Sequence, residues 1–154
     1  MLVLIILVFM CLILIRTFIK WEGISPLVKV LTFLYVSILL RIGNTITERN
    51  LSLMERDKVV IEWITLVIYG VFWTTVLISF ITIIIWKSHF SKLKSFIWYT
   101  TLICVLTGME FFWNWLGYIH FIQWNLFYAI IRIALVIIST IIFLCWIDKK
   151  VIKI

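Results

Sequence analysis

Apolar residues fill five long runs of this chain, and short polar or charged segments separate the runs. The runs cover about residues 1–19, 26–42, 60–86, 95–118 and 121–147. A helix needs about 20 predominantly apolar residues to cross the hydrocarbon core of a bilayer. The pattern therefore predicts an all-α integral membrane protein with about five transmembrane helices. With no long polar block elsewhere, residues 1–154 are expected to form a single polytopic membrane domain.

The last two runs predict a C-terminal helical hairpin with one ionisable residue inside each helix. Glu110 and Arg132 lie equally far before and after Phe121, where the chain is expected to reverse. At about 1.5 Å per residue, both side chains would lie ~16 Å below the turn, close to the membrane midplane. A lone charge at that depth is costly, so we expect the two side chains to pair.

Polar and small side chains on one face of each hairpin helix favour this pairing. At 100° per residue these faces hold Thr100, Cys104, Thr107, Glu110, Asn114 and Gly117 on the first helix, and Asn125, Tyr128, Ala129, Arg132 and Ser139 on the second. We expect a polar intramembrane cluster of Glu110, Arg132, Asn114, Asn125, Tyr128 and Thr107, with Asn114 beside Tyr128 and Gly117 beside Asn125. Large apolar side chains, including Leu102 and Trp113, are expected to face lipid.

The first two runs carry helix signals of different kinds. Arg16 follows the first apolar run, whereas a cleaved signal peptide has its charge before the run, so this segment is expected to remain as a helix. Ser25 and Pro26 form a helix start, and Gly43-Asn44 is expected to end the second helix. Lys29, near one end of that helix, is expected to extend toward water. This run is short for a complete crossing, and a re-entrant or interfacial segment is the alternative.

The third run is preceded by the longest polar segment of the chain. Ser52 and Glu55 have the spacing of a capping box, so the third helix is predicted to extend back to residue 52. Within the predicted helices we expect small residues to allow close helix packing. These are Thr75, Ser79, Thr82, Gly108 and Gly117.

Composition excludes a soluble domain. Of the 154 residues, 65% are hydrophobic and 14% are charged, and the mean hydropathy is +1.22. Soluble domains have about 25% charged residues and about 45–50% apolar ones. The net charge of +7 would favour nucleic-acid binding in a soluble chain. Here the cations lie at the ends of apolar runs, which is typical of loops on the cytoplasmic side of a membrane, so no nucleic-acid partner is expected.

The same cations predict the orientation of the chain in the cell membrane. With the N-terminus outside and the C-terminus in the cytoplasm, the cytoplasmic side carries Arg16, Lys20, Lys29, Lys87, Lys92, Lys94, Lys149, Lys150 and Lys153. The outer side carries Arg41, Arg49, Arg56 and Lys58. Because Lys and Arg concentrate on the cytoplasmic side of membrane proteins, this orientation is favoured over its inverse.

No arrangement of residues predicts catalysis, a metal site or a cofactor. The three cysteines lie inside apolar runs without C-x-x-C spacing, and a buried thiol behaves as a small hydrophobe. His89 and His120 are expected on opposite sides of the membrane, so they cannot share a metal. The motifs of zinc proteases, P-loop enzymes and dinucleotide-binding proteins are absent from the sequence. We therefore expect no enzymatic activity.

Three classes of function remain, and the lipid bilayer is the expected environment in each. The first is an oligomeric pore-forming or channel-like protein, of the holin or membrane-effector type, with the polar cluster near its lumen. The second is a non-enzymatic accessory or immunity-type subunit that binds a partner protein in the membrane. The third is a small transporter. In composition the chain is similar, in a general way, to many small bacterial and phage membrane proteins rich in isoleucine and lysine.

Overall fold

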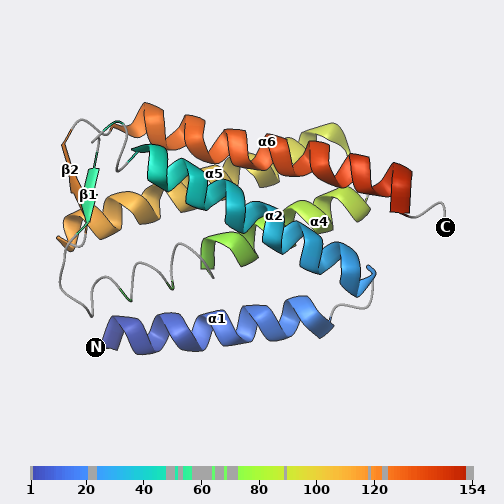
Figure 1. The fold of residues 1–154 in the computed structure, drawn as a ribbon, viewed down its shortest axis with the longest axis horizontal. Coiled ribbons are helices and arrows are strands. Elements are labelled where there is room, and N and C mark those ends of the chain that lie inside the picture. The colour runs from blue at the N-terminus through green and yellow to red at the C-terminus, as the bar shows by residue number, and fades with distance from the viewer. Residues whose placement is uncertain are drawn as a thin grey trace.

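The structure, a computed structural model, is a bundle of antiparallel helices. It describes residues 2–20, 24–47, 51, 54–56, 64, 68, 73–88, 90–117, 119–122 and 125–151. Within this part of the chain the helices are α1 (Leu2–Lys20), α2 (Pro26–Thr45), α4 (Thr74–Lys87), α5 (Lys92–Trp115) and α6 (Leu126–Val151). Two short strands, β1 (Met54–Arg56) and β2 (Ile119–Phe121), pair at one end of the bundle, and the chain termini lie at opposite ends (Figure 1).

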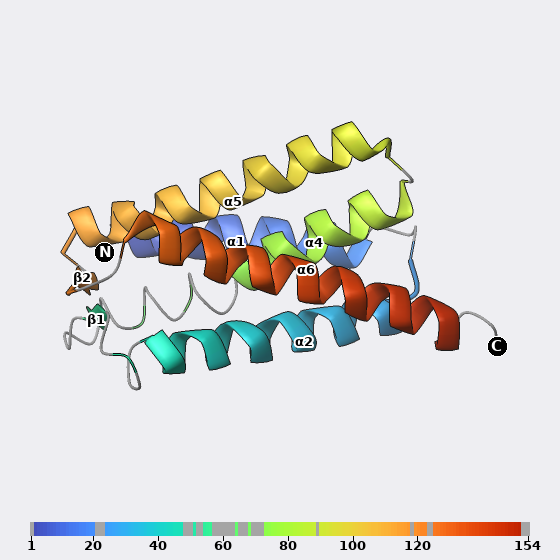
Figure 2. The ribbon, with the colours of Figure 1, turned by 90° about the horizontal axis from the view of Figure 1, so that it is seen from above.

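Two helices occupy the middle of the bundle. Helix α6 lies between α2 and α5 and contacts both (Figure 2). Helix α4 packs against α1, α2, α5 and α6. Helix α1 meets the bundle mainly through α4, so it is the most peripheral of the described helices.

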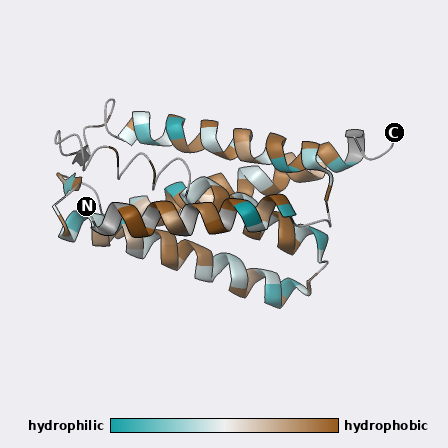
Figure 3. Ribbon diagram, turned by 90° about the horizontal axis from the view of Figure 1, so that it is seen from below, coloured by the Kyte–Doolittle hydropathy of each residue, from teal (hydrophilic) through white to brown (hydrophobic). Residues whose placement is uncertain are grey.

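Three helices, α2, α5 and α6, are long and apolar enough to cross a membrane, and α4 is a shorter apolar helix. The predicted helical character of the chain is therefore confirmed. Of the predicted third span, 60–86, much lies outside the described residues. Large hydrophobic side chains are exposed along α1, α2, α5 and α6, and α1 is hydrophobic over most of its length (Figure 3). Such wide apolar surfaces are unusual on soluble monomers.

Serine side chains cap the starts of α2 and α5. Ser25 accepts a hydrogen bond from the backbone N–H of Val28 at 3.4 Å, and Pro26 is the first residue of α2. This start was predicted, because serine at the cap and proline at the first position satisfy the free amides of a helix end. In α5, Ser91 accepts from the N–H of Lys94 at 3.5 Å. Helix α5 therefore begins at Lys92, earlier than the predicted residue 95.

The predicted end of α2 at Gly43-Asn44 is wrong. The helix continues through both residues to Thr45, and the Thr47 hydroxyl donates to the carbonyl oxygens of Gly43 and Asn44, both at 3.1 Å. Among the described glycines only Gly117 has a positive φ. A glycine ends a helix when it adopts the left-handed conformation, and Gly43 remains helical.

The predicted extension of the third helix to residue 52 is also wrong where the structure describes it. Met54–Arg56 is strand β1, which pairs antiparallel with β2, placing Glu55 opposite His120. Ser52 itself lies outside the described residues. A capping box is a local signal, and here the backbone groups are hydrogen-bonded to a distant strand instead. Phe121, the predicted turn residue, lies in β2, so α6 begins five residues later, at Leu126.

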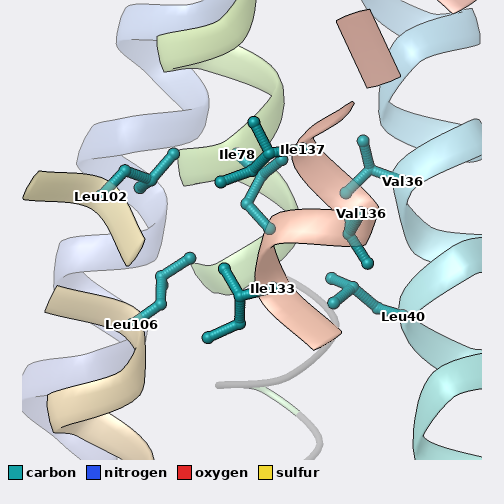
Figure 4. Close-up of a cluster of buried hydrophobic side chains, with 8 residues drawn as sticks. All are labelled: Val36, Leu40, Ile78, Leu102, Leu106, Ile133, Val136 and Ile137. Atoms are coloured by element: carbon teal, nitrogen blue, oxygen red, sulfur yellow. The ribbon is translucent and has the colours of Figure 1, made fainter. Parts of the chain in front are cut away.

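Branched aliphatic side chains fill the centre of the bundle. Figure 4 shows eight of them converging from four helices: Val36, Leu40, Ile78, Leu102, Leu106, Ile133, Val136 and Ile137. A second cluster nearer the strands contains Trp113, Ile119 and Ala129. Leu102 and Trp113 are buried, which corrects the prediction that they face lipid. Thr100 and Cys104, predicted to face inward, are exposed instead.

Candidate functional site: a buried ion pair between three helices

The predicted partners Glu110 and Arg132 form an ion pair between α5 and α6. The Arg132 Nη2 donates to Glu110 Oε1, and only 15% of the arginine side chain and 9% of the glutamate side chain are exposed. The helices bring the two residues together because both face the inside of the hairpin. The predicted pairing is therefore confirmed as a contact.

Arg132 lies closer to the start of its helix than predicted, whereas the depth of the pair in a membrane stays a prediction. Helix α5 ends at Trp115 and α6 begins at Leu126, so the connection between them is longer than predicted. Arg132 lies six residues after the start of α6 at Leu126, or about 9 Å along the helix. The connection is centred next to Phe121, so counting outward from Phe121 paired the correct residues.

A third helix joins the pair through Asn44. The Arg132 Nη1 donates to Asn44 Oδ1 at 2.8 Å, so one guanidinium group links α6 to both α5 and α2. Gly43 packs beside this guanidinium chain, since a Cβ at Gly43 would lie in van der Waals contact with Arg132 Cδ, at 3.6 Å. The sequence analysis assigned Gly43-Asn44 to a helix end and did not predict the hydrogen bond between Asn44 and Arg132. The useful signal was a polar side chain at the end of α2 that antiparallel packing places near Arg132.

Two polar atoms beside the ion pair have no hydrogen-bond partner among the described residues. They are Glu110 Oε2 and the hydroxyl of Thr107, one helical turn earlier, and both residues are buried. A buried polar atom without a partner raises the free energy of the folded state. The site is thus a charged contact between three helices, with acceptor capacity left over on the carboxylate.

The remaining members of the predicted cluster, Asn114, Asn125 and Tyr128, lie at or next to the helix ends that flank the connection. Asn114 Oδ1 accepts from the N–H of Phe121 at 3.2 Å, which holds the connection against α5. Asn125 Oδ1 accepts from the N–H of Tyr128 at 3.1 Å, and so caps the start of α6. The side chain of Tyr128 is 46% exposed. The predicted neighbours Asn114 and Tyr128 thus serve different local contacts, because the chain leaves helical geometry between them.

Of the residues predicted for helix packing, those on α4 are buried in the bundle and the two glycines are not. Thr75, Ser79 and Thr82 on α4 are completely buried, and their hydroxyls have no partner among the described residues. Gly108 is exposed, with open space around the position of a Cβ, so it packs against nothing within the described chain. Gly117 has φ 78° and follows the end of α5. Its role is therefore to end a helix rather than to pack two helices.

Two further polar contacts at other levels of the bundle were not predicted. The hydroxyls of Tyr35 and Ser139 lie 2.6 Å apart, joining α2 to α6, and the Tyr35 ring stacks on Phe143 with centroids 4.0 Å apart. Lys29 Nζ donates to the carbonyl oxygen of Ile19 at 3.0 Å, and Lys29 is only 6% exposed. Lys29 thus caps the end of α1 rather than extending into water, since a cation is favourable at a helix C-terminus.

The described residues contain no group of three or more His, Cys, Asp or Glu that could hold a metal ion. Cys104 and Cys145 are free and exposed on separate helices. Within the described part, the geometry at Glu110 and Arg132 serves to hold helices together. Comparison with protein-family models, curated proteins and solved structures found no match to this chain.

Proposed function

We propose that the chain is a non-enzymatic integral membrane protein whose subunits associate in the bilayer into an oligomeric, channel-like assembly. Three helices of membrane-spanning length and the apolar side chains exposed on the bundle support this proposal. The three helices need an apolar environment to cover those side chains, and a bilayer provides it.

We also propose that the N-terminus is outside the cell membrane and the C-terminus is cytoplasmic. The antiparallel helices bring the end of α1, the start of α2, the end of α4 and the start of α5 to one end of the bundle (Figure 1). Lys20, Lys29, Lys87, Lys92 and Lys94 belong to those helix ends. A cluster of cations at one end favours the cytoplasmic side for that end.

The single observation that supports an oligomer is a stripe of small residues on α5. Thr100, Cys104 and Gly108 follow one another at four-residue spacing, and all three are exposed. If Gly108 carried a Cβ, no described residue beyond the local helix backbone would lie within 4 Å of that atom. In membranes, small residues at this spacing allow two helix backbones to approach closely. No described helix of the same chain uses the stripe, so we assign it to contact between subunits.

A polar path would then lie between subunits rather than through one of them. Aliphatic side chains fill the centre of the single bundle (Figure 4), and Arg132 is engaged by Glu110 and Asn44. The lumen would be lined by the hydroxyl side chains beside the stripe, such as Thr101, which is also exposed. This places the proposed lumen at α5 rather than at the ion pair.

The alternative is an accessory or immunity-type subunit that uses the same stripe to bind a helix of a partner protein. Packing of small residues against a foreign helix needs the same geometry, so the stripe supports both proposals. A small transporter, the third class, has no comparable observation in its favour.

The experiment measures the mass of the purified chain in detergent and dye release from liposomes that contain it. We expect an oligomer and dye release, and we expect Gly108→Leu to reduce both, because the larger side chain separates the helices. Ile138→Phe is the matched control, since Ile138 is 54% exposed on α6 and lies outside the stripe. A monomer that releases no dye contradicts the channel, and co-purification with one defined membrane protein favours the accessory subunit.

A further inference from the structure

A groove between α1 and α4 combines cationic and apolar side chains. Arg16, Thr17 and Lys20 of α1 line one side, Phe80 and Ile84 of α4 line the other, and the volume is about 530 Å³. The groove lies at the C-terminal end of α1, which belongs to the cation-rich end of the bundle. None of the lining residues that the structure describes is acidic, so this part of the groove is suited to an anion.

The two cations are placed to bind one anionic group. Arg16 and Lys20 are exposed and lie four residues apart, which places their Cβ atoms about 5–6 Å apart on one helix face. The Thr17 hydroxyl donates to the carbonyl oxygen of Ile13 at 2.9 Å, so its proton is already used. A guanidinium presents a planar fork of donors that matches phosphate oxygens. The electrostatic contribution therefore comes from Arg16 and Lys20.

The apolar side of the groove favours a hydrocarbon chain. Phe80 packs edge-on against the buried Phe18 of α1, with ring centroids 5.9 Å apart. Ile84 follows one turn later, and the exposed Lys87 lies a further turn along α4. A free phosphate ion would gain nothing from Phe80 and Ile84. A molecule with a phosphate and an acyl chain would use both sides of the groove.

We propose that this groove binds an anionic phospholipid, with its phosphate at Arg16 and Lys20 and an acyl chain against Phe80 and Ile84. The inference rests on the proposed membrane location and cytoplasmic orientation of this end. Basic pockets between membrane helices on the cytoplasmic side suit anionic head groups. Because α1 meets the bundle mainly through α4, a lipid in this groove would add a second link between the two helices.

The test is native mass spectrometry of the purified full chain in detergent, titrated with phosphatidylglycerol or with phosphatidylcholine. We expect tighter binding of phosphatidylglycerol, and we expect Arg16→Gln with Lys20→Gln to weaken it about thirtyfold, the effect of losing two cations near an anionic surface. Lys92→Gln with Lys94→Gln is the control, since both lysines are exposed at the start of α5. The control should bind phosphatidylglycerol as the native chain does.

Three results would overturn the proposal: equal binding of the two lipids, equal loss in the control, or displacement of phosphatidylglycerol by millimolar inorganic phosphate. The last would identify a phosphate site without a lipid. Should the double variant fail to fold, photoactivatable phosphatidylglycerol on the native chain replaces it. Cross-links to the groove support the proposal and cross-links confined to other helices reject it. A monomer that retains phosphatidylglycerol would contradict only the channel, and an oligomer without lipid preference would contradict only the groove.

Discussion

Two arginines of this chain illustrate two ways in which a helix bundle accommodates a cation. Arg132 lies inside the bundle, where it binds Glu110 on α5 and Asn44 on α2. Arg16 lies at the edge, in an open groove whose described lining residues include no acid. A buried guanidinium requires partners from its own chain because water is excluded. An exposed one at the membrane interface can remain available for a partner outside the chain.

The difference between the two regions extends to their stability. Helices α2, α5 and α6 share one charged contact and one aliphatic core. Helix α1 is joined to the bundle mainly through α4, together with the cap from Lys29 to Ile19. Local unfolding draws on regions with few buried contacts. We therefore expect α1 to open more readily than the α5–α6 hairpin, and the predictions below test that difference.

The largest effect is expected at the ion pair. Glu110→Gln or Arg132→Met alone leaves a buried charge without its partner, which costs about 3–5 kcal/mol. The double variant should recover part of that loss, because coupled sites are not additive. Denaturant unfolding in detergent measures the free energies. If the loss in the double variant equals the sum of the two single losses, the pair does not couple α5 to α6, and the contrast with Arg16 disappears.

An intermediate effect is expected at the attachment of α1. Lys29→Met keeps the length of the side chain and removes the charged hydrogen bond to the Ile19 carbonyl, worth about 1.5–3 kcal/mol. Hydrogen exchange should become faster in α1 and remain unchanged in α5 and α6. Lys92→Met is the control, because Lys92 is exposed. Equal acceleration across all helices would mean that α1 and the hairpin unfold as one unit.

The sequence predicted the elements whose signals are periodic or local to a helix. Five apolar runs indicated the helices, Ser25-Pro26 marked the start of α2, and opposite charges on two neighbouring runs indicated the Glu110–Arg132 contact. What it did not predict depends on contacts between distant segments. The strand at Met54–Arg56 needs β2 as its partner, and Asn44 has a role only because α2 packs against α6. Helical periodicity also misplaced part of the buried face of α5. Leu102 and Trp113 were assigned to the face opposite Glu110, but all three residues are buried.

The smallest effect is expected from replacing glycine by alanine at two positions, Gly108 inside α5 and Gly117 just after its end. Gly117, at φ 78°, requires a left-handed conformation that costs an L-residue about 1–2 kcal/mol. Gly108 is inside α5 with open space around it, where alanine should stabilise a helix by about 0.5–1 kcal/mol.

Gly117→Ala should therefore lower the free energy of unfolding and Gly108→Ala should raise it, both measured in a detergent in which the chain is monomeric. The comparison isolates backbone conformation, because the added methyl group is the same and at neither position would it come within 4 Å of a described residue beyond the local backbone. Opposite signs would show that Gly117 serves to end α5, leaving the stripe at Gly108 free for another helix. Equal signs would mean that the connection between α5 and α6 tolerates alanine at Gly117, and that the hairpin depends on Asn114 and the ion pair instead.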